Sequence, residues 1–159
     1  MQLSALLARS AFALAVMCVA AMATPPAAAQ TPAPAYGAPV SMAQAQAAMD
    51  AAMAEARANG WSVAIAIVDA GGHLVMFRRM DGVSTVIGEV AIRKAQTSAA
   101  AMARSSTVSG WPASLGLLGV RGGVPIEVNG RIVGAIGVSG VASENDERIA
   151  AAGAAVVQG

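Results

Sequence analysis

Few residues in this chain have side chains suited to catalysis or metal ligation, and the first of them is a single histidine. The 159 residues include one histidine, His73, and one cysteine, Cys18. Because a protein-only zinc or iron–sulfur site needs several imidazole or thiolate ligands, these counts argue against both. One imidazole is sufficient as an axial ligand to haem iron, since the macrocycle supplies the other four donors. His73 is therefore either an exposed residue at the end of a hairpin or an iron ligand, and it is the best single candidate for such a ligand.

Basic side chains are the second group that could bind a ligand. Arg78, Arg79, Arg93 and Lys94 could pair with haem propionates through charge-assisted hydrogen bonds, or they could form a solvated helix face and strand edge. A rival class of function is an enzyme or accessory protein acting on a small hydroxy or keto acid, with Arg79, Lys94 and Gly122-Gly123 as its anion pocket. A purely structural partner protein is a third alternative.

The sequence comes close to two known motifs, a dinucleotide-binding fingerprint and a nucleophile elbow, but matches neither. Residues 134–140 are spaced G-x-x-G-x-x-G, whereas a dinucleotide fingerprint requires G-x-G-x-x-G. Residues 137–141 lack the last glycine of a nucleophile elbow, and no histidine follows them to act as a base. The sequence therefore argues against dinucleotide binding and against a serine triad.

The first 29 residues have the features of a secretory signal. Arg9 precedes an apolar run over residues 11–21, and three alanines at 27–29 match a small-residue cleavage site. The run is too short for a good membrane span, so stable membrane insertion is not expected. Residues 30–40 are rich in Pro and Ala, which predicts a disordered spacer, and the folded domain then covers residues 41–159. We expect an exported protein, periplasmic or secreted, whose mature form lacks Cys18.

Composition indicates the kind of partner. Beyond residue 29 the chain has nine basic residues, the total of ten less Arg9, and nine acidic ones. Such a balance gives no electrostatic reason to expect nucleic acid binding. With 12% charged and 56% hydrophobic residues, a domain this small would expose apolar patches as a monomer. The sequence therefore favours a homo-oligomer.

Periodicity and turn residues predict the elements that position these side chains. In order, they are a helix over 41–59, strands over 61–69 and 73–79, a helix over 84–103, strands over 124–128 and 132–138, and a helix that begins at Ser143. The side of the second helix predicted to pack inward consists of Val86, Val90, Thr97 and Ala101. The order α-β-β-α-β-β-α with two hairpins indicates an α+β sandwich on an antiparallel sheet.

The second hairpin is the most strongly specified part of the fold. Asn129-Gly130 favours a two-residue type I′ turn, which would place Ile126 opposite Val133. Gly134 and Gly137 interrupt a strand that is apolar on both faces. Glycine weakens a strand unless another group must approach the backbone closely, so we expect a packed helix or a ligand there.

Several spaced motifs, in order along almost the whole domain, resemble the GlcG/HbpS family, which includes the C-terminal domain of PduO-type proteins. The motifs are V-D-A-G-G-H-L at 68–74, R-M-D-G at 79–82, R-K-A-Q-T-S at 93–98, G-G-V-P-I at 122–126 and V-G-A-I-G-V-S-G at 133–140, with Asp146 beyond. The resemblance implies a profilin-like α+β domain with an antiparallel sheet of about five strands, which tends to form higher oligomers. Some secreted members bind haem and are linked to haem sensing or degradation, whereas others are encoded with catabolic enzymes.

With this resemblance, the candidate ligand is haem or another small anionic molecule. His73 is the candidate metal ligand, and thioether ligation by Met76 or Met80 is an alternative. Thr97 could supply an oxygen ligand. The remaining candidate binding residues are Arg79, Lys94, Gly122 and Gly123.

Overall fold

The computed structural model describes residues 34–157, so the predicted signal peptide and the first part of the spacer lie outside the described residues. The elements are β1 (Ala35–Tyr36), α1 (Met42–Ala58), β2 (Ala64–Asp69), β3 (Leu74–Arg79), α2 (Thr85–Ala101), η1 (Ser105–Val108), η2 (Ala113–Leu115), β4 (Gly123–Val128), β5 (Arg131–Ser139) and α3 (Ser143–Ala155). Apart from β1 and the two short 3-10 turns, this is the predicted order. The α+β class is confirmed. None of the helices within residues 34–157 is long and apolar enough to cross a membrane.

The sheet is built around β5, which pairs with three strands. β4 lies along one edge of β5 and β2 along the other, both antiparallel, and β3 pairs with the far side of β2. The two residues of β1 run parallel to Arg131 and Ile132 at the start of β5. The sheet is therefore mixed, and the predicted antiparallel sheet is corrected at this one short strand.

The segment that joins β1 to α1 is held by backbone hydrogen bonds. The amide of Gly37 donates to Ile132 O, the amide of Val40 donates to Val133 O, and the Val40 side chain is buried. The predicted disordered spacer therefore differs from the structure over residues 34–40. Ladder hydrogen bonds to β5 fix these residues, and such long-range pairing is not encoded in Pro- and Ala-rich composition.

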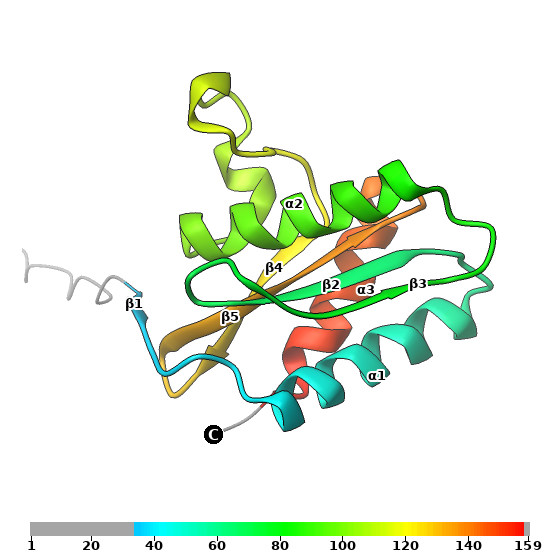
Figure 1. Ribbon diagram of the computed structural model, residues 1–159, viewed down its shortest axis with the longest axis horizontal. Coiled ribbons are helices and arrows are strands. Elements are labelled where there is room, and N and C mark those ends of the chain that lie inside the picture. Colours follow the sequence, from blue (N-terminus) through cyan, green and yellow to red (C-terminus); the bar gives the residue numbers. More distant parts are fainter. Residues whose placement is uncertain (1–33, 158–159) are drawn as a thin grey trace, which may run out of the picture. The chain divides into compact units, whose positions relative to one another are not determined.

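Helices cover the two faces of the sheet unequally (Figure 1). α1 and α3 lie together on one face, where Met49, Ile65, Ile136 and Ile149 form part of a large core. α2 covers the other face through a small layer made mostly of alanine. Because alanine has so little bulk, the backbone of α2 can lie closer to the sheet than it could if leucine or isoleucine filled this layer.

The glycines of β5 allow this close approach. A Cβ atom at Gly137 would overlap the carbonyl oxygen of Ala91 and the amide nitrogen of Ala95, so the prediction of a packed helix over this glycine is confirmed. A Cβ at Gly134 would instead overlap the carbonyl oxygen of Val68 and contact Val40. Gly134 therefore allows the close approach of β2 and of the segment before α1 rather than that of a helix.

The β4–β5 hairpin has the predicted turn but not the predicted register. Asn129 and Gly130 have φ values of 51° and 74°, as a type I′ turn requires. Ile126 lies opposite Gly134 rather than Val133, because β5 carries one extra residue at this point. The predicted Ile126–Val133 pair is therefore wrong, since a bulge shifts the register without any signal in the apolar pattern.

The prediction for the buried side of α2 is also wrong. The side chain of Val86 is 65% exposed, and the buried residues of the helix are Gly88, Ala91, Lys94, Ala95, Thr97, Ser98 and Ala99. A helix that packs this closely must bury its small residues, so the bulkier valine lies outside. Of the predicted stripe, only Thr97 is buried.

Candidate functional site

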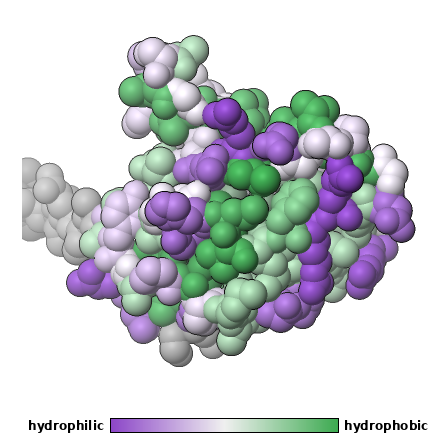
Figure 2. All heavy atoms as spheres, viewed as in Figure 1, coloured by the Kyte–Doolittle hydropathy of each residue, from purple (hydrophilic) through white to green (hydrophobic). Residues whose placement is uncertain are grey.

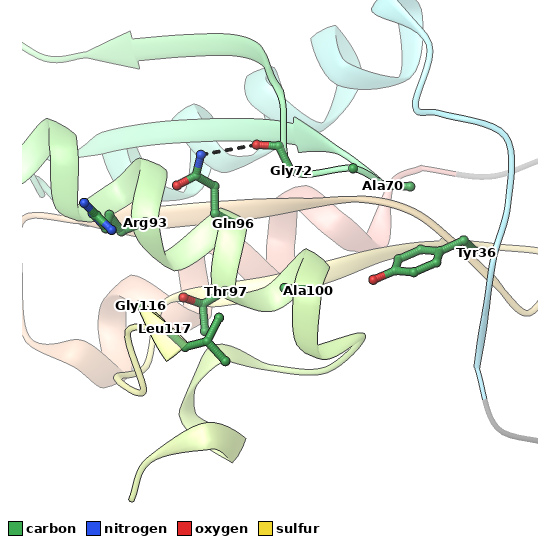
Figure 3. Close-up of a pocket in the computed structure, with 10 residues that line it drawn as sticks. Tyr36, Ala70, Gly72, Arg93, Gln96, Thr97, Ala100, Gly116 and Leu117 are labelled. Atoms are coloured by element: carbon green, nitrogen blue, oxygen red, sulfur yellow. Dashed lines mark hydrogen bonds between the residues drawn. The ribbon is translucent and has the colours of Figure 1, made fainter. Parts of the chain in front are cut away.

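A cavity of about 520 Å³ lies beside α2. Four parts of the chain line it: β1, the β2–β3 turn, α2 and the loop after η2 (Figure 3). The lining residues are Tyr36, Ala70, Gly71, Gly72, Arg93, Gln96, Thr97, Ala100, Gly116 and Leu117. The predicted candidate Thr97 is among them.

α2 supplies one wall through a single stripe of side chains. Arg93, Gln96, Thr97 and Ala100 are spaced three and four residues apart, which places them on the same helix face. Within residues 34–157, no hydrogen bond or ion pair engages the exposed Arg93 side chain. Its guanidinium group is therefore available to an anion at the rim of the cavity.

Two hydrogen bonds fix the neighbours of Arg93. The side-chain amide of Gln96 donates to the carbonyl oxygen of Gly72 at 3.3 Å, which ties α2 to the β2–β3 turn (Figure 3). The hydroxyl oxygen of Thr97 accepts a hydrogen bond from the amide of Leu118 at 2.8 Å. Because the Thr97 side chain is nearly completely buried, it positions the loop and offers little surface to a ligand.

The opposite wall is the β2–β3 turn, which the Asp69 side chain organises. Its Oδ1 accepts hydrogen bonds from the amides of Gly71 and His73, both at 2.9 Å. These bonds lower the pKa of Asp69 below its ordinary value, and the bond from the His73 amide contributes most to that shift. Gly72 has a φ of 82°, which a side chain would disfavour. The glycine pair thus makes a tight turn whose backbone lines the cavity.

His73 lies directly after this glycine pair, with its side chain 83% exposed. Its Nδ1 is 3.3 Å from Oδ1 of Asp69. An ionised carboxylate can only accept, so in the neutral imidazole Nδ1 carries the proton in this contact and Nε2 keeps its lone pair. Paired in this way, an imidazole has the form in which histidine ligates metals, although its ring does not line the cavity within one chain.

Lys94, in contrast, points away from the cavity and is buried. Its ammonium nitrogen lies 2.7 Å from Oδ2 of Asp146 and 3.0 Å from the carbonyl oxygen of Val138, and only 3% of the side chain is exposed. Burial raises the pKa of Asp146, although the hydrogen bond and charge of Lys94 and the amide of Val141 oppose that effect. The alternative interpretation of Lys94 as part of a solvated face is therefore wrong. The ammonium is already engaged by protein groups.

Gly122 and Gly123 belong to this buried cluster. A Cβ at Gly122 would lie 2.9 Å from the Lys94 ammonium and 2.6 Å from Val138 O, and one at Gly123 would overlap the carbonyl oxygen of Lys94. Arg79, the last residue of β3, lies elsewhere: its guanidinium donates to the hydroxyl of Thr85, the first residue of α2, at 2.9 Å. Of the six candidate site residues, the structure brings Thr97 to the cavity and His73 to its edge. It does not bring the other four to the cavity, nor does it assemble the predicted anion pocket.

Sequence reasoning missed Tyr36, and it counted Arg93 only among several basic residues. Tyr36 lies in a Pro- and Ala-rich stretch, and its one distinguishing signal is that it is the only tyrosine in the chain. Arg93 could have been singled out by the helical spacing it shares with Gln96, Thr97 and Ala100. Among the described residues, no cluster of three His, Cys, Asp or Glu side chains could hold a metal ion alone.

The fold and the cavity define a class: a small α+β domain with a five-stranded sheet and an open cavity beside its second long helix. The particular family follows from comparison with known proteins. The chain belongs to the family described as haem degrading protein HbpS-like, whose model matches residues 40–155. The family predicted from the sequence motifs is thereby confirmed.

Individual relatives agree with this assignment. The protein GlcG of Escherichia coli strain K12 is 37% identical over 109 residues, which cover 63% of this chain and 81% of GlcG. A double mutant of HbpS from Streptomyces reticuli is 32% identical with a TM-score of 0.70, covering 85% of this chain and 98% of HbpS. A structure described as a PduOC:heme complex is 25% identical with a TM-score of 0.68, covering 74% of this chain and 94% of PduOC.

Proposed function

We propose that this protein binds haem in the cavity on α2. Support comes from the family description and from the relative solved as a haem complex. The observation that carries the proposal is the place of His73, the only imidazole of the chain, directly after the glycine pair that lines the cavity. Its contact with Asp69 leaves Nε2 free for iron.

Three properties of the cavity support this proposal. Its volume of about 520 Å³ falls within the range of roughly 300–1,000 Å³ that is usual for small-molecule sites. Backbone of the glycine turn and the small side chain of Ala100 allow a flat ligand to approach closely. Arg93 at the rim would pair with a propionate. Haem supplies iron redox chemistry when bound, and these residues of the chain bind and orient it.

The test is a titration of the purified protein with hemin, followed by its Soret absorption. We expect a saturable Soret shift in the wild type and at least a tenfold loss of affinity in His73→Ala, because the iron loses its imidazole. Electron paramagnetic resonance of the wild-type complex should show a nitrogen-ligated iron. A shift that persists with equal affinity in His73→Ala would remove His73 from the site, and no shift in the wild type would overturn the proposal.

We also propose that the mature protein is exported and begins after Ala29. The basis is Arg9, the short apolar run and the alanines at 27–29. Intact-mass measurement of the protein from its native host tests this, and a cytoplasmic species that still begins at Met1 or Gln2 would contradict it. Export would suit a role in haem sensing, storage or degradation outside the cytoplasm.

A homo-oligomer is the expected assembly. Figure 2 shows a hydrophobic area in the middle of the face where β3 and α1 lie, bordered by hydrophilic residues. Leu74 and Phe77 of β3 are 50% and 38% exposed, and Trp111 and Leu115, which lie between η1 and β4, are also exposed. A second copy would bury such surface. Light scattering at micromolar concentration measures the mass, and a clean monomer would refute the assembly.

The alternative proposal is an enzyme or accessory protein acting on a small hydroxy or keto acid. The unpaired Arg93 guanidinium favours a carboxylate ligand, and the match to GlcG is compatible with either function. The cavity volume favours haem, because a two- or three-carbon acid would fill a small part of it. Saturable binding of such an acid by calorimetry, with no hemin binding, would establish the alternative.

A further inference from the structure

Tyr36 occupies a position in the cavity that the proposed function leaves unexplained. It belongs to β1, far in sequence from α2 and from the β2–β3 turn, yet its ring lines the same cavity. In Figure 3 it lies at the opposite end of the labelled group from Arg93, with its hydroxyl directed toward α2. Among the described residues that line the cavity, Tyr36 is the only aromatic one.

The ring is held in place by polar contacts. Its hydroxyl donates to the carbonyl oxygen of Ala99 at 2.9 Å. Ala99 belongs to the last turn of α2, and its carbonyl oxygen also accepts the amide of Met102 at 3.3 Å, so the phenol adds a second hydrogen bond at this helix end. The backbone is fixed as well, because the Arg131 guanidinium donates to Tyr36 O at 3.0 Å and β1 pairs with the start of β5. A side chain that is 41% exposed is thereby kept in one orientation.

We propose that Tyr36 contacts the ligand and selects for a flat, aromatic one. Most of the other lining residues are glycine, alanine or polar, and they offer little apolar surface to a macrocycle. An aromatic ring that is already oriented gives a planar ligand a large contact area at low entropic cost. The wall exists only when residues 35–37 are docked on β5, so the N-terminal segment completes the site. This inference rests on the proposed haem function and names the residue that recognises the porphyrin plane.

Protoporphyrin IX, which lacks iron, separates contact with the plane from iron ligation. We expect Tyr36→Ala to lose at least tenfold in affinity for both protoporphyrin IX and hemin, which corresponds to about 1.4 kcal/mol. Tyr36→Phe, the matched variant that keeps the ring, should stay within about threefold of the wild type. His73→Ala should weaken hemin binding while leaving protoporphyrin IX binding unchanged.

A second measurement does not depend on how the variants fold. Because Tyr36 is the only tyrosine of the chain, nitrotyrosine found by peptide mapping after treatment with tetranitromethane comes from this residue alone. Protoporphyrin IX at saturation should slow the nitration several-fold, whereas an equal volume of the solvent without porphyrin should not.

A further variant separates the bulk of the side chain from its aromatic ring. Tyr36→Leu, which keeps much of the bulk without the ring, should bind protoporphyrin IX as poorly as Tyr36→Ala.

The outcomes separate the two proposals. If the wild type binds both porphyrins and Tyr36→Ala binds them equally well, or if nitration is not slowed, Tyr36 does not contact the ligand and the haem proposal stands without it. If the wild type binds neither porphyrin, the proposed function itself has failed, and the inference about Tyr36 falls with it.

Discussion

Two aspartates beside α2 each pair with a basic side chain, and their surroundings give them different roles. Lys94 and Asp146 are 2.7 Å apart, with 3% of each side chain exposed. Asp69 and His73 are 3.3 Å apart, with 23% and 83% exposed. In the buried pair, Val138 O and the Val141 amide engage the same ammonium and carboxylate groups. In the exposed pair, one imidazole nitrogen remains open. The buried pair therefore stabilises the packing of α2, whereas the exposed pair leaves a side chain that could bind a ligand.

The buried pair also shows why a basic residue beside a candidate site is weak evidence of ligand binding. Lys94 follows Arg93 directly, but successive helix residues lie about 100° apart around the axis. One side chain therefore points toward β5 and Asp146 while the other reaches the rim of the cavity. A sequence shows that two charges are adjacent, and the packing of the helix decides which one is available.

The largest expected effect comes from breaking the buried pair. Lys94→Met should lower the free energy of unfolding by about 3–5 kcal/mol, because Asp146 would be left as a buried charge without its partner. Urea denaturation measures the change. The double variant Lys94→Met, Asp146→Leu should recover most of the loss. The exposed pair Arg121–Glu144, 3.5 Å apart, is the control, since Arg121→Ala should cost less than about 1 kcal/mol. A small effect of Lys94→Met would contradict this stabilising role of the buried pair.

The second effect compares added bulk at the two glycines of β5 with added bulk on the cavity side of α2. Gly137→Ala should cost about 1–3 kcal/mol through overpacking, because its Cβ would overlap the helix backbone. Gly134→Ala should cost a similar amount through its overlap with the Val68 carbonyl oxygen. Ala100→Val adds bulk on the cavity side and should cost less than about 1 kcal/mol, the difference in helix propensity. Equal melting temperatures for wild type, Gly134→Ala and Gly137→Ala would show that neither glycine has a packing role.

A smaller effect is expected at the rim of the cavity. Arg93→Gln should weaken hemin binding about three- to tenfold, the size of one charge-assisted hydrogen bond in a partly exposed place. Arg57→Gln, which removes an exposed arginine from α1 on the other face of the sheet, should leave the affinity unchanged. The loss in Arg93→Gln should also shrink at high salt. Equal losses in both variants would point to net charge rather than to a site.

The smallest effect concerns pH and the exposed pair. Hydrogen bonds from the His73 and Gly71 amides lower the pKa of Asp69 in the folded state. A lowered folded pKa gives stability that is fully present above the ordinary value of 3.8 and is lost as pH falls through the folded value. Asp69→Asn should therefore be less stable than wild type near neutral pH, by less than about 1 kcal/mol, and equally stable in strong acid. A difference that grows in acid would contradict this assignment.

Local chemistry in the sequence was enough to determine much of the fold. Ser41 begins α1 with a capping box, as its residue type and the Gln44 three residues later favour. Asn129-Gly130 makes the turn of the β4–β5 hairpin, and Asp69 to Gly72 the turn before β3. These features depend on neighbouring residues, so their patterns are visible in a single chain. The sequence motifs likewise predicted the family.

Tertiary structure alone decided which side of α2 packs inward, because alanine and glycine carry no apolar signal strong enough to outweigh Val86. It also decided the bulge in β5, the burial of Lys94 against Asp146 and the docking of Tyr36 on the cavity. The ion pair and the bond from Tyr36 to Ala99 each join residues far apart in the chain, 52 residues for the first and 63 for the second. Composition and periodicity describe how a segment meets solvent and its nearest neighbours along the chain. Which distant group finally meets a given side chain is set by the packing of the whole domain.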